Sequence, residues 1–500
     1  MVWDMKREDL SVGVVGAGAM GRGIAQVAAV AGIPVLLSDA RAGAAEEAVA
    51  FVGDMLDRAV AKGRMDRDAA EAAKGRLGVV EGIAAFASCA VVVEAVVEDL
   101  EVKRLLFAEL EGVVAEDCIL ATNTSSLSVT AIAAACARPE RVAGFHFFNP
   151  APLMKLVEVI PGVRTEPGVV AALGELARRV GHTPVTATDT PGFLVNHAGR
   201  AYGTEALRIV GEGIADFASV DRILRDALGF RMGPFELLDL TGLDVSHPVF
   251  ESIYDQFYQE PRYRPSPITR RRLAAGFLGR KAGRGFYEYR EGSPVAPAPP
   301  PVPAGRDVPV WISRGDPAAC QALRASLGAA GAELEGDDAP GAASLCVVTP
   351  LGADCTTAAL AEGLDPARTV AVDMLVEPVE HWTVMGNPAT RRDMLDSAHA
   401  LFARTGVPTS VIGDSPGFVA QRVIAMVVSV ACDIAQQRIA TPEDIDLAVT
   451  LGLGYPHGPL AWGDRLGPRR ILAILEAMHA FYADPRYRPS PWLKRRALLG

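Results

Sequence analysis

The stretch VGVVGAGAMG (12–21) decides the fold of this chain. It places a short apolar run directly before a GxGxxG pattern that spans residues 16–21. A helical pattern follows from residue 20 to about residue 31, and a second apolar run, 35–37, ends at Asp39. Strand, glycine turn, helix and strand in this order predict the first βαβ unit of a doubly wound α/β sheet.

The glycine pattern predicts a dinucleotide site. Its first glycine makes the tight turn, the second lets the backbone approach a pyrophosphate, and the third packs the helix on the strand. Asp39, at the end of the next strand, is expected to bind the adenine-ribose hydroxyls and repel a 2′-phosphate, which favours NAD over NADP. The alternatives are that Asp39 is a simple turn residue, or that Arg41 softens the preference. The predicted cofactor-binding residues of this loop and strand are Gly16, Gly18, Ala19, Met20, Gly21 and Asp39.

Apolar and helical segments alternate through the first 188 residues and then give way to helical patterns. A Pro-rich segment, SPVAPAPPPVPAG (293–305), has the composition of a semi-rigid linker. We therefore predict a Rossmann-like NAD-binding domain (1–188), an all-α helical domain (189–290), a linker (291–305), a degenerate Rossmann-like domain (306–412) and a second helical domain (413–500).

The second half of the chain repeats the first at a nearly constant offset. TPGFLVN (190–196) matches SPGFVAQ (415–421), and FYQEPRYRPSP (257–267) matches FYADPRYRPSP (481–491). A fainter match joins RVAGFHFFNP (141–150) to TVAVDMLVEP (369–378). We predict that the two-domain unit is duplicated. No GxGxxG lies near 308–312, the corresponding strand of the second half, so one dinucleotide is expected per chain.

Composition excludes several classes of function. Half the residues are hydrophobic and the formal net charge is −11, without the basic stripe of a nucleic-acid binder. The seven cysteines form no CxxC pair, which argues against a zinc site or disulfide framework and favours a reducing compartment. The N-terminal segment lacks the apolar run of a signal peptide, and the longest apolar stretches fall short of the roughly 20 residues that a bilayer needs. We expect a cytoplasmic protein that binds no metal, nucleic acid or membrane.

A second stretch, GFHFFNPAPLMKLVE (144–158), suggests chemistry. Two strand-like runs, 142–148 and 153–160, flank the turn signal NPAP (149–152), so a chain reversal would set His146 opposite Glu158. A carboxylate beside an imidazole fixes its tautomer and favours proton acceptance, and hydride removal from a secondary alcohol needs such a base. These residues alone leave His146 evenly balanced between a catalytic base and a buried core histidine.

Several ordered motifs resemble the 3-hydroxyacyl-CoA dehydrogenase family, almost continuously over residues 12–290. They are GAGAMGRGIA (16–25), EAVVEDLEVK (94–103), TNTSSLSV (122–129), GFHFFNPAPLMKLVEVI (144–160), DTPGFLVN (189–196) and PSPITRRRLAAGFLGRKAGRGFYEY (265–289). The resemblance implies NAD-dependent oxidation of an L-3-hydroxyacyl-CoA thioester to the 3-oxoacyl-CoA. Single-copy members of the family dimerise through the helical domain, so the second helical domain is expected to act as an internal pseudo-dimer partner, alone or within a homo-oligomer.

The resemblance also implies roles for single residues. His146 is similar to the general base, Glu158 to the carboxylate that orients it, and Ser125 and Asn196 to residues around the substrate's 3-oxygen. The remaining implied positions are Asn149 near the nicotinamide, Glu98 and Lys103 at its ribose, and Lys62 at the CoA phosphates.

Other interpretations of these residues stay open. Glu94 and Glu98 would then be solvated strand-end carboxylates, Ser125 a cap for a helix starting at Leu127, and Asn196 a surface residue. Residues 270–272, three arginines, are expected to form a solvated helix face rather than a phosphate clamp. His197, where the family usually has a basic residue, is interpreted as structural.

The second copy has lost the chemistry in this alignment. Met374 takes the place of His146, Glu377 that of Asn149, Gly386 roughly that of Glu158, and Gln421 that of Asn196. The second half is therefore expected to serve packing.

Three functions remain in competition. Duplicated chains of this length resemble 3-hydroxyadipyl-CoA dehydrogenases of phenylacetate breakdown, and a 3-hydroxybutyryl-CoA or general fatty-acid β-oxidation enzyme is the close alternative. A hydroxyisobutyrate or 6-phosphogluconate type of dehydrogenase would use a lysine base, against which HFFNP argues. A catalytically silent NAD-binding regulator fits the second half better than the first.

Overall fold

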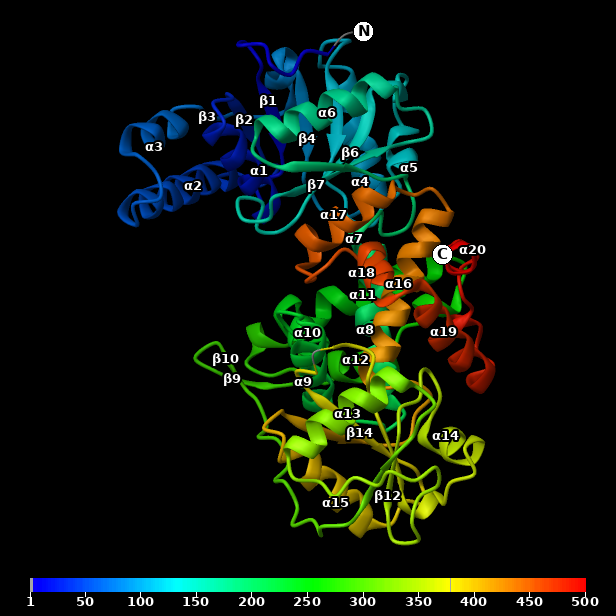
Figure 1. Cartoon of the computed structure of the whole chain (residues 1–500). Coiled ribbons are helices and arrows are strands. Elements are labelled where there is room, and N and C mark those ends of the chain that lie inside the picture. Colours follow the sequence, from blue (N-terminus) through cyan, green and yellow to red (C-terminus); the bar gives the residue numbers. More distant parts are fainter. Residues whose placement is uncertain (1–2, 378) are drawn as a thin grey trace. The chain divides into compact units, whose positions relative to one another are not determined.

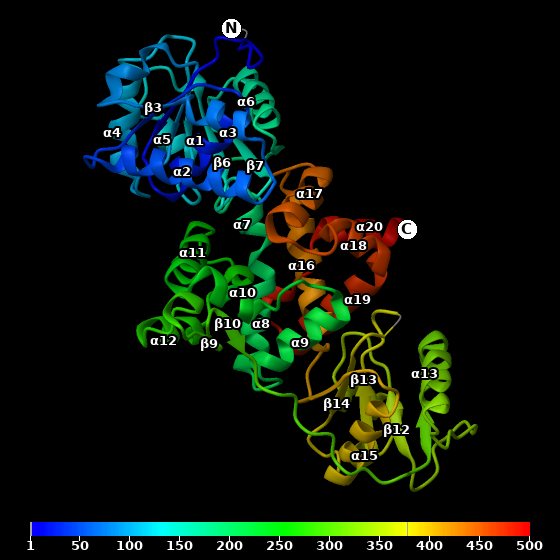
Figure 2. The same ribbon diagram turned by 90° about the vertical axis from the view of Figure 1, so that its left-hand side faces the viewer.

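A computed structural model describes residues 3–377 and 379–500 of the chain. It divides into two compact units (Figures 1 and 2). The first unit comprises Met1–His197 together with Gln437–Leu453, and the second comprises Ala198–Gln436 together with Gly454–Gly500. A segment from the C-terminal part of the chain thus belongs to the N-terminal unit.

The first unit is built on an eight-stranded sheet with the order β3-β2-β1-β4-β5-β6-β7-β8. All neighbouring strands are parallel except β6 and β7, and β1 pairs with both β2 and β4, so the predicted βαβ unit is confirmed. The strands are β1 (Val12–Val15), β2 (Val35–Ser38), β3 (Leu77–Val79), β4 (Val91–Glu94), β5 (Ile119–Thr122), β6 (Val142–Phe147), β7 (Leu156–Pro161) and β8 (Thr183–Thr186).

Helices cover this sheet because its central strands are apolar on both faces. All four residues of β1, β4 and β5 are buried, which is the pattern of a parallel sheet enclosed by helices. The helices are α1 (Ala19–Val30), α2 (Ala44–Ala61), α3 (Arg67–Lys74), α4 (Leu100–Glu111), α5 (Val129–Ala133), α6 (Pro167–Arg179) and α7 (Val195–Ala198). In Figure 1, α2 and α3 project from one edge of the sheet.

A helix from the far end of the sequence, α17 (Pro442–Leu453), completes the first unit. It packs on β7 and β8, and a Cβ atom at Gly452 would lie 2.9 Å from Leu156 and 3.0 Å from Val195. Backbone hydrogen bonds support the contact, since the Thr188 amide donates to the Ile439 carbonyl at 2.9 Å. Strands β7 and β8 are therefore buttressed by a segment that lies roughly 250–300 residues further along the chain.

The second unit joins helices to a smaller sheet with the order β11-β12-β13-β14-β15. Its strands are β11 (Val310–Ile312), β12 (Leu345–Val348), β13 (Thr369–Val372), β14 (Trp382–Gly386) and β15 (Thr409–Ile412), covered by α13 (Pro317–Ala329), α14 (Cys355–Ala361) and α15 (Arg392–Ala403). The helical part contains α8 (Arg200–Gly211), α9 (Phe217–Leu228), α10 (Pro234–Thr241), α11 (Leu243–Gln256), α12 (Pro267–Ala274), α16 (Val419–Gln436), α18 (Pro459–Leu466), α19 (Pro468–Tyr482) and α20 (Pro491–Leu499). A hairpin of β9 (Glu288–Arg290) and β10 (Ser293–Val295) extends into the predicted linker.

The register of β13 and β14 corrects one predicted correspondence. Val372 pairs with Val384, so continuing this antiparallel ladder sets Met374 opposite Trp382. The alignment of Gly386 with Glu158 was therefore wrong, because the reversal in the second sheet is about four residues tighter than in the first. A buried tryptophan stands where the first sheet has its carboxylate.

Helix α16 is long and apolar enough, by length and composition, to cross a membrane. In the structure 89% of its 18-residue window is buried, and it lies against α8, α18, α19 and α20 inside the second unit. It also carries the buried charged residues Arg422 and Asp433. These are the properties of a core helix of a globular unit.

Candidate active site

The glycine loop after β1 has the shape that a dinucleotide requires. Gly16 has a φ of +103°, and a Cβ atom there would lie 2.4 Å from the Ala95 carbonyl oxygen. A Cβ atom at Gly21 would overlap the Gly16 carbonyl, whereas one at Gly18 would meet nothing within 4 Å. Gly16 and Gly21 are thus needed for the turn and the helix packing, and Gly18 leaves space in front of the amino end of α1, where an anion is favoured.

Asp39 holds this loop from the end of β2. Its Oδ2 accepts a hydrogen bond from the Ala17 amide at 2.7 Å, and Oδ1 accepts one from the Arg41 amide at 2.8 Å. The Arg41 guanidinium is instead paired with Glu47. The residues present therefore fit a dinucleotide, with a fixed carboxylate at the position expected to meet the ribose hydroxyls.

A buried ion pair lies where β4 ends. The Lys103 ammonium lies 2.5 Å from Oε1 of Glu94, whose other oxygen accepts from the Thr122 hydroxyl at 2.7 Å. Both side chains are almost completely buried, so the interpretation of Glu94 as a solvated carboxylate was wrong. The position of Glu94, a charged residue directly after the buried run VVV (91–93), was a signal for a buried, paired group.

Glu98 links this ion pair to the end of β5. It lies 3.3 Å from the Lys103 ammonium and accepts hydrogen bonds from the Thr124 hydroxyl at 2.7 Å and the Ser125 amide at 2.9 Å. Burial alone would raise the pKa of Glu98, but the Thr124 hydroxyl, the Lys103 charge and the serine donors outweigh it and hold that pKa below its usual range. Glu98 is therefore an ionised, structurally held carboxylate.

Ser125 lies beside Glu98 and does not cap the next helix. The cap of α5 is Ser128, whose hydroxyl accepts from the Ala131 amide at 3.2 Å. Asp189 reinforces that helix start by accepting from the Val129 amide at 2.9 Å. The interpretation of Ser125 as a helix cap was therefore wrong, and its hydroxyl makes only a long, 3.4 Å contact with Glu98.

His146 and Glu158 face each other across β6 and β7, as the turn signal predicted. They are a register pair of the antiparallel ladder, and His146 Nδ1 lies 2.6 Å from Glu158 Oε2. Glu158 is fully buried, and its Oε1 accepts from the amides of Leu194 at 3.0 Å and Val195 at 2.8 Å. A carboxylate at this position accepts from an Nδ1 proton, so the contact favours the imidazole tautomer that leaves the lone pair on Nε2.

Aromatic rings and an amide group complete the surroundings of His146. The rings of Phe148 and Phe193 lie 4.5 and 5.9 Å from the imidazole, centroid to centroid. Asn123, which sequence reasoning missed, accepts from the Phe147 amide at 2.8 Å and so joins the end of β5 to β6. The position of Asn123, between the end of β5 and Ser125, was the sequence signal that could have identified it.

The other expected residues lie at different levels of exposure. Asn196 is half-buried in the first turn of α7, next to Val195, and the neighbouring His197 is fully buried. Asn149 is exposed in the turn that follows His146. Lys62 is exposed at the carboxyl end of α2, the helix that projects from the sheet edge in Figure 1. The structure thus links Ser125 and Lys103 to Glu98 and links His146 to Glu158, and it leaves Lys62 on the surface.

The corresponding end of the second sheet is closed by other contacts. Met374 is buried in the hydrophobic core of that sheet. The Gln421 side chain donates to Asp373 at 2.9 Å and accepts from the Gly352 amide at 2.8 Å. Methionine and glutamine cannot take a proton at neutral pH, so neither side chain that replaces His146 or Asn196 can act as a base.

Comparisons with known proteins agree with this geometry. The family model "3-hydroxyacyl-CoA dehydrogenase, NAD binding domain" matches residues 11–190. The model "3-hydroxyacyl-CoA dehydrogenase, C-terminal domain" matches residues 192–289 and again 417–500. The chain belongs to the 3-hydroxyacyl-CoA dehydrogenase family. Its nucleotide is accordingly NAD, as the glycine loop and Asp39 predicted.

Relatives of two lengths resemble the chain. A 3-hydroxyadipyl-CoA dehydrogenase of Escherichia coli K12 is 40% identical over 98% of both chains. A probable 3-hydroxybutyryl-CoA dehydrogenase of Deinococcus radiodurans is 40% identical, and its full length matches only 56% of this chain. Among solved structures, a 3-hydroxybutyryl-CoA dehydrogenase from Escherichia coli K12 is 36% identical and superimposes with a TM-score of 0.85, covering 98% of each chain.

Proposed function

We propose that this protein oxidises L-3-hydroxyacyl-CoA thioesters to 3-oxoacyl-CoA, with NAD as hydride acceptor. The observation that carries the proposal is the buried pair of His146 and Glu158, in which Nδ1 is engaged by the carboxylate, in a dinucleotide-binding unit. NAD, when bound, supplies the carbon that accepts the hydride. The protein must then remove the proton of the substrate hydroxyl, which is the role of His146 Nε2.

Glu158 prepares the imidazole for this proton transfer. Its Oε2 accepts from Nδ1 and so keeps Nε2 in the basic form, and it compensates the positive charge once the imidazole is doubly protonated. The amides of Leu194 and Val195 fix Oε1, so the carboxylate cannot rotate away. Glu158 therefore orients and stabilises the base.

The surrounding polar residues suit the remaining tasks. Ser125 and Asn196 are proposed to hydrogen-bond the 3-oxygen of the substrate. Glu98 holds Ser125 at the end of β5, and Asn196 directly follows Val195, whose amide binds Glu158. Glu98, Lys103 and Asn149 are proposed to contact the nicotinamide ribose and ring. Lys62, exposed on α2, is proposed to meet the CoA phosphates.

The acyl group is proposed to be 3-hydroxyadipyl, in phenylacetate breakdown. The support is that the relative of this name shares the full length of the chain, including the second half that the shorter 3-hydroxybutyryl-CoA dehydrogenases lack. The full-length crystal structure, named for 3-hydroxybutyryl-CoA, favours that thioester as the second candidate.

The second half is proposed to be a degenerate duplicate that serves as an internal dimer partner. The helical family model matches twice, and complete relatives match 56% of the chain. Within the first unit the Thr188 amide donates to the Ile439 carbonyl, and within the second unit the Gly413 amide donates to the Ile214 carbonyl at 2.8 Å. These two bonds join residues that correspond at the repeat offset, so each Rossmann-like sheet is contacted by the helical region of the other copy.

The domains proposed on this basis are 1–188, 189–290, 306–412 and 413–500, with a linker over 291–305. The free, mostly buried cysteines support a cytoplasmic location.

The test of the catalytic proposal is NADH formation at 340 nm with a panel of thioesters. Purified protein would be given NAD and L-3-hydroxybutyryl-, L-3-hydroxyhexanoyl- or 3-hydroxyadipyl-CoA, in parallel with a His146→Ala variant. We expect turnover that collapses in the variant, with the adipyl thioester giving the highest kcat/KM. Tight NAD binding without turnover of any thioester would contradict the proposal and favour a silent NAD-binding regulator.

The test of the duplicate is a truncation that ends at residue 305. The truncated chain loses α17 and every residue that α16 presents to α8, so we expect aggregation or loss of activity. A truncated chain that remains soluble and fully active would refute the role of the second copy.

A further inference from the structure

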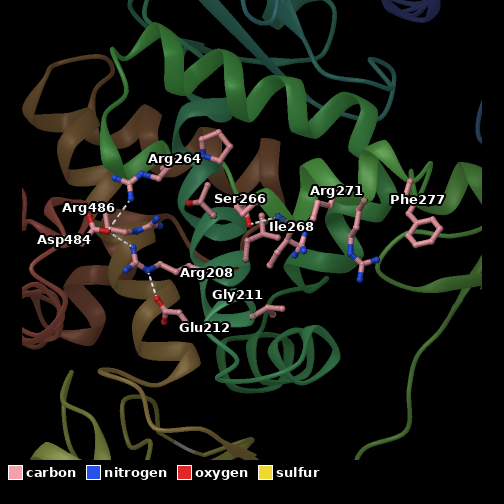
Figure 3. A pocket seen from close by; sticks show the side chains of 17 residues that line it. Arg208, Gly211, Glu212, Arg264, Ser266, Ile268, Arg271, Phe277, Asp484 and Arg486 are labelled. Atoms are coloured by element: carbon pink, nitrogen blue, oxygen red, sulfur yellow. Dashed lines mark hydrogen bonds and ion pairs between the residues drawn. The ribbon is translucent and has the colours of Figure 1, made fainter.

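A trough in the second unit lies outside the residues assigned to catalysis (Figure 3). Its volume is about 960 Å³, which is in the range of small-molecule sites. Helix α8 and the segment 264–277 form most of its wall, and two residues from the C-terminal helical segment, Asp484 and Arg486, complete one end. The trough therefore exists only where the two helical halves of the chain meet.

The wall of the trough is strongly cationic. Two carboxylates, Glu212 and Asp484, are outnumbered by five guanidinium groups in a chain whose formal net charge is −11. The five belong to Arg208, Arg264, Arg271, Arg272 and Arg486. Clustered positive charge at a concave surface raises the local concentration of anions.

Three of the arginines are held in place by the protein itself. Arg208 is paired with Glu212 and Asp484, each at 2.7 Å. Arg486 is paired with buried Glu205, and Arg272 lies over the Phe286 ring. These arginines shape the wall and contribute to its potential, but most of their hydrogen-bonding capacity is used.

The other two arginines, Arg264 and Arg271, keep most of their hydrogen-bonding capacity. Arg264 is half-exposed, and its guanidinium makes only a 3.8 Å approach to Asp484 among the described residues. Arg271 is exposed, and its guanidinium makes no hydrogen bond or ion pair with any residue of 3–377 or 379–500. The sequence prediction of a solvated face holds for its neighbour Arg270, which is exposed and does not line the trough.

The floor between the two arginines is apolar. In Figure 3, Arg264 stands toward one end and Arg271 toward the other, where Phe277 lies, and Ile268 lies between them. The apolar lining residues are Leu207, Val210, Pro265, Ile268, Ala275 and Phe277. Separated cations above an apolar floor match a ligand with a charged group and a hydrophobic body.

We propose that this trough binds an amphipathic organic anion. Its carboxylate or phosphate group would pair with Arg264 or Arg271, since guanidinium groups bind both anions in bidentate fashion. Its apolar body would lie on Ile268 and Phe277. The proposal is independent of the proposed oxidation, because no residue of the trough belongs to the dinucleotide site or to the His146 pair.

The test is a titration of the full-length protein with 8-anilinonaphthalene-1-sulfonate, an amphipathic anion that fluoresces in apolar sites. Saturating NAD keeps the dinucleotide site filled. The double variant Arg264→Gln/Arg271→Gln should raise the Kd roughly tenfold or more, because charge-assisted hydrogen bonds are lost. The matched control Arg270→Gln should leave the Kd unchanged.

A second variant tests the apolar floor with the charges intact. Ile268→Trp introduces the residue that the repeat carries at the corresponding position, Trp492, and should weaken binding of the fluorophore. Displacement by octanoate identifies a carboxylate ligand, and displacement by adenosine monophosphate identifies a phosphate ligand. Binding that is unchanged in the double variant, or that neither competitor displaces, would overturn the proposal.

Discussion

Arg422 is the residue whose removal should most weaken the contact between the two helical halves. It lies on α16, is fully buried, and pairs with Glu205 of α8 at 2.8 Å and with Glu212 at 2.8 Å. The hydroxyls of Tyr482 and Tyr487 each lie 3.0 Å from its guanidinium. One side chain of the second helical half thus pairs with two carboxylates of the first.

The change Arg422→Met keeps an unbranched side chain but removes the charge. Breaking a buried pair by deleting one partner costs roughly 3–5 kcal/mol, because the remaining charge is left uncompensated. Glu205 would still be bound by Arg486 at 2.9 Å and by the Tyr487 hydroxyl at 2.9 Å. Burial raises the pKa of Glu205, and the arginines Arg422 and Arg486 normally outweigh this, so the variant can also relieve the cost by protonation. We therefore expect the lower end of the range, about 3 kcal/mol.

Urea unfolding followed by tryptophan fluorescence measures this change. Four of the five tryptophans, Trp311, Trp382, Trp462 and Trp492, belong to the second unit, so the signal reports the unit that holds Arg422. The matched control is Arg488→Met, because Arg488 is half-exposed and contacts Glu260 at 3.4 Å. That surface pair should contribute less than about 1 kcal/mol. An Arg422→Met variant no less stable than the control would refute the reasoning.

Three further predictions concern other contacts. Gly452→Val would place a branched side chain against Leu156 and Val195. Because the Val195 amide holds Glu158, we expect a lower kcat with unchanged affinity for NAD. An unchanged kcat would contradict the buttressing role of α17. Lys103→Met leaves the Glu94 carboxylate buried without its cation, which should cost roughly 3–5 kcal/mol of stability. Thermal unfolding of the first unit should therefore begin at a lower temperature. An unchanged unfolding midpoint would contradict the stabilising role of this ion pair. Burial lowers the pKa of His381 below 6.5 in spite of its 2.9 Å contact with Asp226. Below pH 6.5 the unfolded chain therefore binds a proton that the folded chain refuses, and stability falls as pH drops through the lower folded pKa. His381→Gln should flatten this fall when urea midpoints at pH 7 and pH 5 are compared, and equal slopes would speak against the assignment.

Local pattern was sufficient for the first βαβ unit and for the pairing of His146 with Glu158, whereas the catalytic role of His146 rested on the family resemblance. The apolar run, the glycines and Asp39 follow one another within a few residues, so the turn and its helix are specified where they occur. His146 and Glu158 were found because they are placed symmetrically about the turn signal NPAP, and an antiparallel register then brings them together. Both inferences needed contacts of short sequence separation only.

Contacts between distant segments could not be predicted in the same way. The burial of Glu94 depends on Lys103 and Thr122 meeting it from two other elements. The packing of α17 on β7 involves residues separated by almost 300 positions, and the local hydrophobic pattern of neither segment indicates it. Trp382 was missed as the counterpart of Glu158 because the tighter reversal of the second sheet shifts the alignment there by about four residues. Tertiary packing decided each of these features.

The most direct test of the account is the turnover of Glu158→Gln with the best thioester and saturating NAD. Glutamine preserves the shape but places an amide donor or a weaker acceptor against Nδ1, so Nε2 loses the fixed, basic form that takes the hydroxyl proton. We expect kcat to fall roughly a hundred-fold or more while the Kd of NAD stays within about twofold. A Glu158→Gln variant that turns over at the wild-type rate would contradict the claim that His146 and Glu158 act together as the base.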